Sequence, residues 1–468
     1  MKLEQIIRNT GASIISGHAG DEITSICCDS RKACKGSAFI AVKGYAGDGH
    51  DYIDAALSNG ASAIIDADRK ALALCADNFY SHPSGKLRLV GITGTNGKTT
   101  TVTLLYNLFR SLGYECGLLS TIANFVGSRR SETENTTADP ITINSLLSEM
   151  VEAGCEFCFM EVSSIGVEQQ RVAGLEFKVG IFSNLTHDHL DYHKTFAEYL
   201  RCKKKFFDDL GPDAVAITNI DDRNGDIMVQ NTGAKVITYS CRTLADHNCR
   251  IMEESFEGML LKIDGTEAWT RLTGAHNAYN ILAIYSTAIA LGAGTEETLV
   301  AISKLESAPG RLETIAGPRG LNAVIDYAHT PDALENVLKT LRDIAPEREL
   351  VCLFGCGGDR DRAKRPEMAA ICEKFADRIF VTSDNSRTER TEDIIEDIKK
   401  GFSAAGLAKA VCIPDRREAI RTAIMFSPAG STILLAGKGH ETYQIIGKEK
   451  FHFDEKEIVK EVFDSISD

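Results

Sequence analysis

The segment GITGTNGKTT, residues 91–100, constrains the fold of this chain more than any other part of it. It follows an apolar run at residues 87–90 and precedes a stretch, Val102 to Phe109, whose apolar residues recur at i, i+3, i+4 and i+7. That spacing predicts an amphipathic helix. A strand, a glycine-rich loop and a helix in this order indicate a parallel sheet with an anion at the helix N-terminus.

The loop has the chemistry of a nucleotide-phosphate site although it is not a strict P-loop. The pattern G-x-x-x-x-G-K-[ST] requires glycine at the position of Ile92. The remaining residues still provide backbone N–H groups, a lysine cation and a hydroxyl for Mg²⁺. A glycine turn without a ligand would not require Lys98 and Thr99 after the second glycine. We therefore predict that ATP binds Gly94, Thr95, Asn96, Gly97, Lys98, Thr99 and Thr100.

The pattern along the whole chain predicts an α/β fold with three domains. Strand-like runs that end in Gly or Asp alternate with helix-period segments from residue 87 onward. The loops YSHPSGK and SAPGR interrupt this pattern near residues 85 and 310. We predict an N-terminal domain at 1–85, a central domain at 86–310 and a C-terminal domain at 311–468. The central domain is predicted to contain a P-loop-type parallel sheet with helices on both faces, and the C-terminal domain to be Rossmann-like.

Charge and hydropathy exclude several classes of protein. The net charge of -14 disfavours a nucleic-acid partner, because phosphate-backbone binding requires clustered Lys and Arg. The N-terminus lacks the apolar core of a signal peptide, and no stretch approaches eighteen uninterrupted apolar residues. The fourteen scattered cysteines indicate reduced thiols. We expect a cytoplasmic protein with small-molecule partners and no membrane span.

Candidate metal ligands lie downstream of the phosphate loop. Glu161 ends a predicted strand, in the position where P-loop enzymes place the carboxylate that binds Mg²⁺. The segment FSNLTHDHLDYH contains His187, His189 and His193, which are typical of zinc sites. Their spacing does not place them on one face of a regular element. From the residues alone, metal binding and solvent exposure of these histidines therefore both remain open.

The order of the motifs is similar to that of the Mur ligase family. GTNGKTT, MEVSS, NLTHDHLDYH, LTGAHNAYN, PGRLE, DYAHTPDAL, FGCGGDRDRAKRP and AGKGHE follow one another as in that family. The segment DSRKACKGSAFIAVKGYAGDGHDYI also resembles its nucleotide-sugar domain, so the resemblance covers nearly the whole chain. More narrowly, the chain resembles the branch that adds the third residue of the peptidoglycan stem peptide. This implies a ligase that makes an acyl phosphate from ATP, which an amine then attacks.

The resemblance also implies catalytic residues and metal ligands. Thr99 and Glu161 would hold one Mg²⁺, and His189 together with a carbamylated Lys203 would help to hold a second. The family's lysine lies in Y-x-x-A-K, and this chain reads YLRCK at residues 199–203, with cysteine in place of alanine. Without the resemblance, the three consecutive lysines would be interpreted as the solvated face of a helix. The implied catalytic residues are Lys98, Lys203 and His189.

Further ATP contacts are implied in two domains. Asn277 and His329 correspond to residues that contact adenine in the family, and Arg311 and Asp326 to residues that contact the γ-phosphate and the ribose. Since Arg311 and Asp326 lie at or just beyond the second predicted boundary, closure of the domains would be needed to complete the site.

The implied acceptor substrate is UDP-N-acetylmuramoyl-L-Ala-D-Glu. Ser30 would contact its uridine end. One departure lies here, because family members often carry histidine after VSS whereas this chain has Ile165. The sugar and peptide would be bound by Asn135, Thr136, Thr137, Ser163, Gln169 and Arg171.

The C-terminal domain is expected to select the amino acid. Family members that add meso-diaminopimelate carry D-N-P-R, whose arginine binds the far carboxylate, and this chain reads Asp384-Asn385-Ser386-Arg387. Loss of the proline loosens the turn but keeps the guanidinium. Arg360, Gly437 and Glu441 would complete the pocket, with Glu441 facing the distal ammonium. We predict meso-diaminopimelate as the substrate, with L-lysine as the alternative.

Two other functions remain to be weighed. A folylpolyglutamate-type ligase would share the ATP domain, but it would not account for the GGDRDRAKRP and AGKGHE segments or for a separate domain before residue 85. A P-loop nucleotide switch would not require an amino-acid pocket. A ligase consumes ATP only when both co-substrates are present, and a switch does not depend on them.

Overall fold

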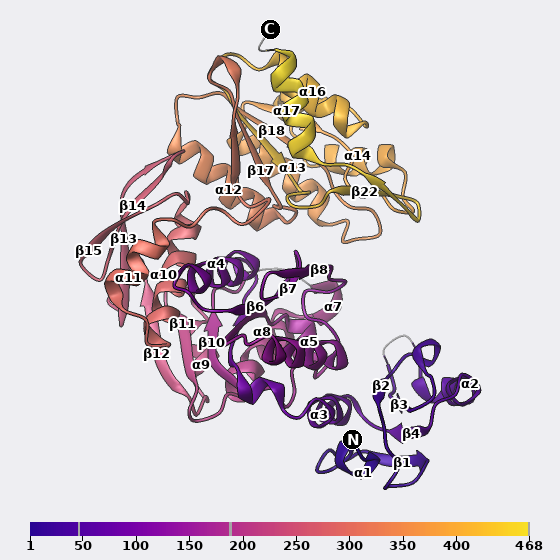
Figure 1. Cartoon of the computed structure of the whole chain (residues 1–468). Coiled ribbons are helices and arrows are strands. Elements are labelled where there is room, and N and C mark those ends of the chain that lie inside the picture. The colour runs from indigo at the N-terminus through magenta and orange to yellow at the C-terminus, as the bar shows by residue number, and fades with distance from the viewer. Residues whose placement is uncertain (45–46, 187–189, 467–468) are drawn as a thin grey trace.

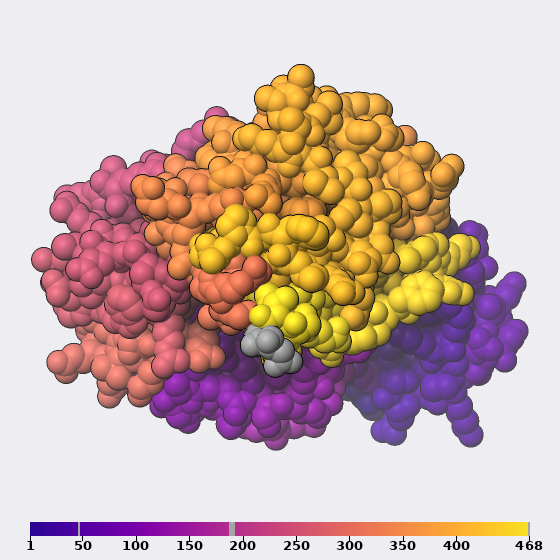
Figure 2. Space-filling view, turned by 90° about the horizontal axis from the view of Figure 1, so that it is seen from above, coloured from indigo at the N-terminus to yellow at the C-terminus, as the bar shows by residue number. Residues whose placement is uncertain are grey.

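The computed structural model describes residues 1–44, 47–186 and 190–466, and it contains three α/β bodies in chain order (Figure 1). The α/β fold with three domains is therefore confirmed. The exact boundaries near residues 85 and 310 remain our proposal. Seen from the side of the C-terminal domain, that domain covers much of the central one, and the N-terminal domain lies at one side (Figure 2).

The N-terminal body is a small four-stranded sheet. Its order is β1-β4-β3-β2, and only the pair at the β1 edge is antiparallel. Helix α3 packs both on α1 and on α5 of the central body, and so joins the two bodies. The elements are α1 (Leu3–Ile6), β1 (Ser13–Ser16), β2 (Ser25–Cys27), η1 (Ser30–Lys32), β3 (Ser37–Ala41), η2 (Gly49–Tyr52), α2 (Ile53–Ser58), β4 (Ala63–Asp66), α3 (Arg69–Phe79) and η3 (Pro83–Lys86).

The central body contains an eleven-stranded sheet, with the phosphate-loop strand β5 in its interior. In the spatial order given below, every neighbouring pair of strands between β6 and β13 is parallel, which confirms the predicted parallel sheet at the centre. Antiparallel strands extend both edges. In spatial order the strands are β15 (Thr266–Thr270), β14 (Gly258–Ile263), β13 (His247–Ser255), β12 (Lys235–Ser240), β11 (Val215–Asn219), β10 (Phe177–Phe182), β5 (Arg88–Thr93), β9 (Phe157–Glu161), β6 (Cys116–Leu119), β7 (Asn124–Val126) and β8 (Arg129–Ser131).

Helices cover both faces of the central sheet, as predicted. One apolar core joins the sheet to α4 (Lys98–Ser111), α10 (Ala275–Ala290) and α11 (Thr295–Ile302). A second core on the other face joins it to α5 (Pro140–Glu152), α6 (Ser164–Glu168), α8 (Phe196–Asp208) and α9 (Gly225–Val229). The short helix α7 (Leu190–His193) precedes α8.

The C-terminal body is a six-stranded sheet between two layers of helices. Its strands are parallel apart from the edge strand β16, which agrees with the predicted Rossmann-like domain. In spatial order they are β16 (Glu313–Ala316), β17 (Asn322–Asp326), β21 (Thr432–Ala436), β18 (Leu350–Phe354), β19 (Arg378–Val381) and β20 (Ala410–Cys412). The other elements are η4 (Pro318–Gly320), α12 (Pro331–Ile344), α13 (Lys364–Phe375), α14 (Thr391–Lys399), α15 (Ala404–Lys409), α16 (Arg416–Phe426), β22 (Tyr443–Ile446), β23 (Glu449–His452) and α17 (Glu455–Ser465).

Two features bear on the expected setting of the protein. All fourteen cysteines are free, in agreement with the prediction of reduced thiols. Within the three described ranges, no helix combines the length and the apolar character needed to cross a bilayer.

Candidate active site

The phosphate loop has a shape that only glycine permits at two positions. Gly94 and Gly97 have φ values of +157° and +88°. A Cβ atom at Gly94 would lie 1.9 Å from Ser183 Oγ, and one at Gly97 would lie 2.5 Å from Asn280 Oδ1. Both distances are shorter than any non-bonded contact, so the two glycines let the loop pack closely on neighbouring segments.

Hydrogen bonds fix the loop beside the segment that follows β10. Asn184 accepts the N–H of Thr95 on its carbonyl oxygen at 2.8 Å and the N–H of Asn96 on its side chain at 2.9 Å. Lys98 Nζ donates to the carbonyl oxygens of Gly94 (2.9 Å) and Thr95 (2.8 Å). Because α4 begins at Lys98, the positive charge of the lysine and the positive end of the helix dipole lie at the same end of the loop.

A cavity of about 290 Å³ opens in front of the loop, between the central and C-terminal bodies. The parallel strands of both bodies direct their following loops toward it, as expected for ligand sites in α/β sheets. Ile165 also lines this cavity. The predicted site residues around it are Thr95, Asn96, Gly97, Lys98, Thr99, Thr100, Asn135, Thr136, Thr137, Glu161, Ser163, Arg171, Lys203, Arg311, Asp326 and His329.

Arg311, in the C-terminal body, can donate hydrogen bonds to an anion in this cavity. Its Nη2 donates to Thr99 Oγ1 at 3.5 Å, and its guanidinium lies 4.7 Å from the ring centroid of Tyr327. Its Nε is buried and has no hydrogen-bond partner in the described parts of the chain. A buried donor without a partner is costly, and a phosphate oxygen would satisfy it.

Asp326 holds the backbone beside Arg311. Its carboxylate accepts the N–H groups of Leu312 (2.7 Å) and Ala328 (2.8 Å). Burial raises its pKa, and the nearby Arg311 guanidinium partly opposes this effect. His329, two residues beyond Tyr327, lines the same cavity, and its Nδ1 lies 2.9 Å from the Tyr327 carbonyl oxygen.

Thr99 and Glu161 fit a hard cation. The side chain of Glu161 is only 1% exposed and accepts the N–H of Thr121 at 2.8 Å. Among the described residues it forms no ion pair. A buried carboxylate requires a compensating cation, and carboxylate and hydroxyl oxygens are ligands that suit Mg²⁺. His189, the other predicted ligand, lies outside the described residues, and within them no group of three His, Cys, Asp or Glu could hold a metal.

Lys203 is buried at the same cavity. It is 1% exposed, and its Nζ donates to the Gly94 carbonyl oxygen at 2.8 Å and lies 4.6 Å from the Tyr199 ring centroid. By contrast, Lys204 and Lys205 form ion pairs with aspartates one turn along α8. The interpretation of three solvated lysines therefore does not hold for Lys203.

Four of the residues predicted to bind the nucleotide sugar, Thr137, Ser163, Gln169 and Arg171, form one network beside Glu161. Thr137 Oγ1 donates to the Glu161 carbonyl oxygen at 2.9 Å and accepts the N–H of Ser163 at 3.0 Å. Arg171 donates to the carbonyl oxygen of Thr137 at 2.5 Å and to Gln169 Oε1 at 2.7 Å. Burial lowers the pKa of Arg171. The guanidinium therefore lies at the cavity wall, bound to a carbonyl and an amide.

Ser30 and Asn277, predicted to contact the uridine and the adenine, do not line this cavity. Ser30 lies in η1 of the N-terminal body, where its carbonyl oxygen accepts from Asn59 Nδ2 at 2.9 Å. Asn277 is buried in α10; its Nδ2 donates to the Thr273 carbonyl oxygen at 2.7 Å, and its Oδ1 accepts from Asn280 at 3.0 Å. In this orientation the Asn277 amide is not directed at a ligand in the cavity.

Three of the residues predicted to bind the amino acid, Asp384, Asn385 and Glu441, surround a buried lysine. Lys438 Nζ lies 3.4 Å from Asp384 Oδ1, 3.1 Å from Asn385 Oδ1 and 3.2 Å from Glu441 Oε2. Burial raises the pKa of Glu441, which Lys438 partly opposes. For Asp384, burial also favours the neutral form, but Lys438 and other cations outweigh it and lower the pKa. A Cβ on Gly437 would lie 3.5 Å from Asp384 Oδ2.

Arg387 joins two loops of this cluster. It has a left-handed φ of +50°, and its Nη1 donates to the carbonyl oxygens of Gly358 (2.9 Å) and Asn385 (3.3 Å). Ser386 is buried beside it. Arg360 lies on the Gly358 loop and is exposed, and its Nη1 approaches the neighbouring carbonyl oxygen of Asp359 at 3.3 Å.

A second buried ion pair, between Arg416 and Glu455, stabilises the loops that contain Asp384 and Gly437. The side chains of Arg416 and Glu455 are both fully buried and lie 2.7 Å apart. Arg416 also donates to the carbonyl oxygens of Ser383 (3.1 Å) and Ala436 (2.8 Å). These residues directly precede Asp384 and Gly437, so one guanidinium fixes the starts of both loops.

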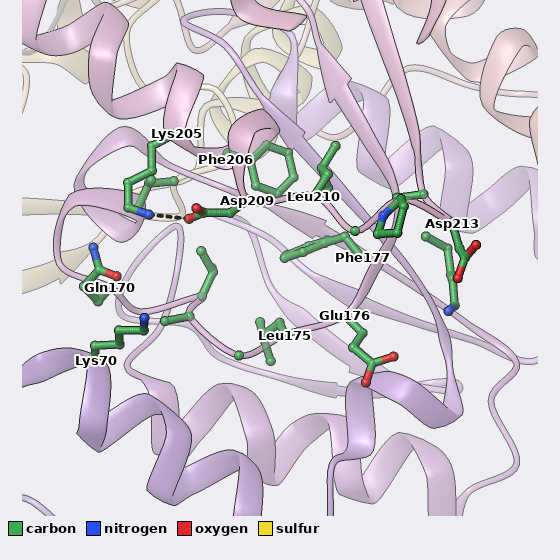
Figure 3. Close-up of a pocket in the computed structure, with 18 residues that line it drawn as sticks. Lys70, Gln170, Leu175, Glu176, Phe177, Lys205, Phe206, Asp209, Leu210 and Asp213 are labelled. Atoms are coloured by element: carbon green, nitrogen blue, oxygen red, sulfur yellow. Dashed lines mark hydrogen bonds and ion pairs between the residues drawn. The ribbon is translucent and has the colours of Figure 1, made fainter. Parts of the chain in front are cut away.

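Two further cavities lie apart from the phosphate loop. One of about 400 Å³ lies between the central and C-terminal bodies and includes Glu441 in its lining. The other, of about 480 Å³, lies beyond the opposite end of β10 and contains none of the predicted site residues in its lining (Figure 3). Figure 3 shows Lys205 paired with Asp209 at its edge.

Sequence reasoning missed several residues of the site. Lys438 and Asn184 lie within quoted motifs, yet their bonds to other loops have no local signal. Tyr199 was used only to locate Lys203, although its hydroxyl lies 3.1 Å from Thr95 Oγ1.

Comparisons with known proteins match the chain along its whole length. Three models match successive parts: "Mur ligase family, catalytic domain" at residues 22–90, "Mur ligase middle domain" at 92–288, and "Mur ligase, glutamate ligase domain" at 310–439. A protein of Cytophaga hutchinsonii named UDP-N-acetylmuramoyl-L-alanyl-D-glutamate--2,6-diaminopimelate ligase is 46% identical, with 100% of both chains covered. A protein of the same name from Parabacteroides distasonis is 47% identical, with 99% of both covered. A solved structure of a ligase of that name is 31% identical, with a TM-score of 0.72, and covers 100% of this chain and 99% of its own.

Proposed function

The chain belongs to the Mur ligase family, and from that premise we propose that it adds meso-diaminopimelate to UDP-N-acetylmuramoyl-L-Ala-D-Glu in peptidoglycan synthesis. It is an ATP-dependent ligase that forms an amide bond. The observation that carries this function is that the phosphate loop, Arg311 and Lys203 line one cavity. The cytoplasm, which supplies ATP and nucleotide-linked sugars, remains its predicted location.

The reaction requires two anions to meet. The substrate carboxylate attacks the γ-phosphorus of ATP, the bond to ADP breaks, and an acyl phosphate forms. At about 4 Å and an effective dielectric constant near 20, two unit charges repel by about 4 kcal/mol. Lys98 and Arg311 face the cavity from opposite bodies and offset this repulsion with fixed positive charge. The amine of the amino acid then attacks the acyl carbon, and inorganic phosphate leaves.

Thr99 and Glu161 are proposed to hold Mg²⁺. The ion, when bound, supplies further positive charge beside the phosphates. We also propose that Lys203 carries a carbamate, formed when its neutral amine takes up CO₂, and that His189 joins it at a second metal site. The position of Lys203 in the lining of the same cavity as Thr99 and Glu161 supports this proposal.

The remaining ATP contacts are proposed on the two sides of the cavity. His329 would contact the adenine, and Asp326 would orient the ribose side while it holds the backbone next to Arg311. Asn277 would also contact the adenine, but only if its amide turns away from Thr273.

The nucleotide-sugar dipeptide is proposed to extend from the N-terminal body to the cavity. Ser30 would contact the uridine, and hydroxyl and amide groups near Glu161 would bind the sugar and peptide. Ile165 at the cavity provides no polar contact there. The proposed contacts at the cavity end are Asn135, Thr136, Thr137, Ser163, Gln169 and Arg171.

The pocket around Arg387 and Glu441 is proposed to select the amino acid. Arg387 would bind the far carboxylate of meso-diaminopimelate and Glu441 its distal ammonium, while Arg360 and the 384–387 turn complete the pocket. Serine in place of proline leaves the turn less constrained by its own backbone. Bonds to the β22–β23 hairpin compensate, because Ile445 N–H donates to Asn385 Oδ1 at 2.9 Å and Gly447 N–H to the Arg387 carbonyl oxygen at 2.7 Å.

The proposed function is tested by the mass of the product. The protein is incubated with UDP-N-acetylmuramoyl-L-Ala-D-Glu and ATP, together with either meso-diaminopimelate or L-lysine. We expect a tripeptide product with diaminopimelate and little with lysine, because lysine lacks the second carboxylate that Arg387 would bind. ATP consumption should require both co-substrates. A preference for lysine would contradict the assigned amino acid, and ATP turnover that is indifferent to the amino acid would contradict the ligase.

A further inference from the structure

A carboxylate of the C-terminal body reaches the phosphate loop from outside the cavity. Asp332 is the second residue of α12, and its Oδ2 accepts from Asn96 Nδ2 at 2.7 Å and from Thr186 Oγ1 at 3.1 Å. Asn96 and Thr186 belong to the central body. Asp332 is not among the residues that line the ATP cavity, whereas Thr330 and Ala333 on either side of it are.

Both donors are firmly attached to the loop. The carbonyl oxygen of Asn96 accepts from Ser183 Oγ at 2.7 Å and from Asn184 Nδ2 at 3.1 Å. The N–H of Thr186 donates to Thr95 Oγ1 at 3.0 Å. A shift of the Asp332 carboxylate would therefore act on the phosphate loop through Asn96 and on the segment after β10 through Thr186.

On its own side, Asp332 is held by a capped helix. Pro331 is the first residue of α12, and the Thr330 hydroxyl accepts the N–H of Ala333 at 3.4 Å. His329, which lines the ATP cavity, lies three residues before Asp332. The position of the carboxylate is thus tied to the wall of the site that the C-terminal body provides.

We infer that Asp332 is a positioning residue that couples closure of the C-terminal body to the geometry of the phosphate loop. This inference rests on the proposed ATP site. Hydrogen bonds to an ionised acceptor are stronger than those between neutral groups, so the two bonds hold α12 against the loop. Asn336 Nδ2, on the same helix, also donates to Asp332 Oδ2 at 3.4 Å, and the bonds to Asn96 and Thr186 are the ones that join α12 to the phosphate loop.

A double-mutant cycle tests the coupling. Asp332→Ala and Asp332→Asn are made in the full-length protein and in an Asn96→Ala/Thr186→Val background. Binding of a non-hydrolysable ATP analogue is measured by calorimetry, and kcat/KM for ATP by phosphate release. Asp343→Ala is the matched control, because Asp343 is an exposed aspartate near the other end of the same helix. Thermal unfolding of each variant reports on the fold.

We expect Asp332→Ala to weaken analogue binding and to lower kcat/KM for ATP by about tenfold, the effect of losing a charge-assisted hydrogen bond. Asp332→Asn keeps an acceptor oxygen and should recover most of the loss. In the Asn96→Ala/Thr186→Val background the alanine change should cost clearly less than in the wild-type background, since the two donors of the central body are absent. Asp343→Ala should leave all values unchanged.

Two results would contradict the inference. An equal effect of Asp332→Ala in both backgrounds would show that the carboxylate acts elsewhere, and no effect in the wild-type background would show that the contact does not matter. If the wild-type protein binds the analogue, the proposed ATP site holds, and either result counts against the inference on Asp332 alone. Wild-type protein that binds no ATP analogue would overturn the ATP site, and the inference with it.

Discussion

Replacing Lys98 by alanine is expected to lower kcat/KM for ATP by about 10³-fold while the protein stays folded. Lys98 Nζ lies at the mouth of the phosphate loop, within 2.9 Å of two loop carbonyl oxygens. When ATP enters, the same cation is placed to neutralise the phosphate that the substrate carboxylate must approach. Alanine removes this positive charge from the site of the phosphates, and no other side chain in residues 91–100 is charged.

The measurement is the rate of phosphate release at saturating co-substrates, with unfolding followed in parallel. Lys70→Ala is a suitable control, because Lys70 is an exposed lysine that lines the separate 480 Å³ cavity. We expect its activity to stay within about twofold of wild type, as is usual for surface substitutions. Full activity of Lys98→Ala would contradict the assigned reaction.

Arg387→Ala is expected to raise KM for meso-diaminopimelate by about 10²-fold, with a much smaller change in KM for ATP. The guanidinium is held at the junction of two loops by its bonds to Gly358 and Asn385. Truncation removes the charged fork that would bind the far carboxylate and leaves that carboxylate without a partner.

Arg390→Ala serves as the control for this change. Arg390 lies three residues away, and its side chain is 75% exposed. Steady-state kinetics with varied diaminopimelate should show wild-type behaviour for this variant. An unchanged KM for diaminopimelate in Arg387→Ala would contradict the role of Arg387 in choosing the amino acid.

Much of the fold could be predicted from local patterns. The runs EFCFMEV, FKVGIFSNL and DAVAITNI correspond to β9, β10 and β11, which lie in one parallel sheet with β5. Buried parallel strands are nearly continuous apolar runs, so they are evident in the sequence. The antiparallel edges were not predicted. Strand β13, for example, reads HNCRIMEES and has a single buried residue, so its antiparallel pairing with β14 is not evident from its own composition.

The site was predicted where short motifs carry the chemistry, and missed where distant residues meet. The phosphate loop, Glu161 and Arg311 were identified from motifs, and they line one cavity. The bond between Asn96 and Asp332 joins residues 236 positions apart, and nothing in either local sequence indicates it. Lys438 is similar, since its burial among three polar side chains follows from the packing of two loops.

The central claim is that the γ-phosphate of ATP passes to the substrate carboxylate before the amide bond forms. It is tested most directly with UDP-N-acetylmuramoyl-L-Ala-D-Glu whose reacting carboxylate carries ¹⁸O in both oxygens. The protein, ATP and meso-diaminopimelate are added, and the released phosphate is weighed. One ¹⁸O atom in each phosphate is the predicted result, because the carboxylate oxygen that attacks phosphorus departs with it. Unlabelled phosphate, released together with the tripeptide product, would contradict the acyl phosphate.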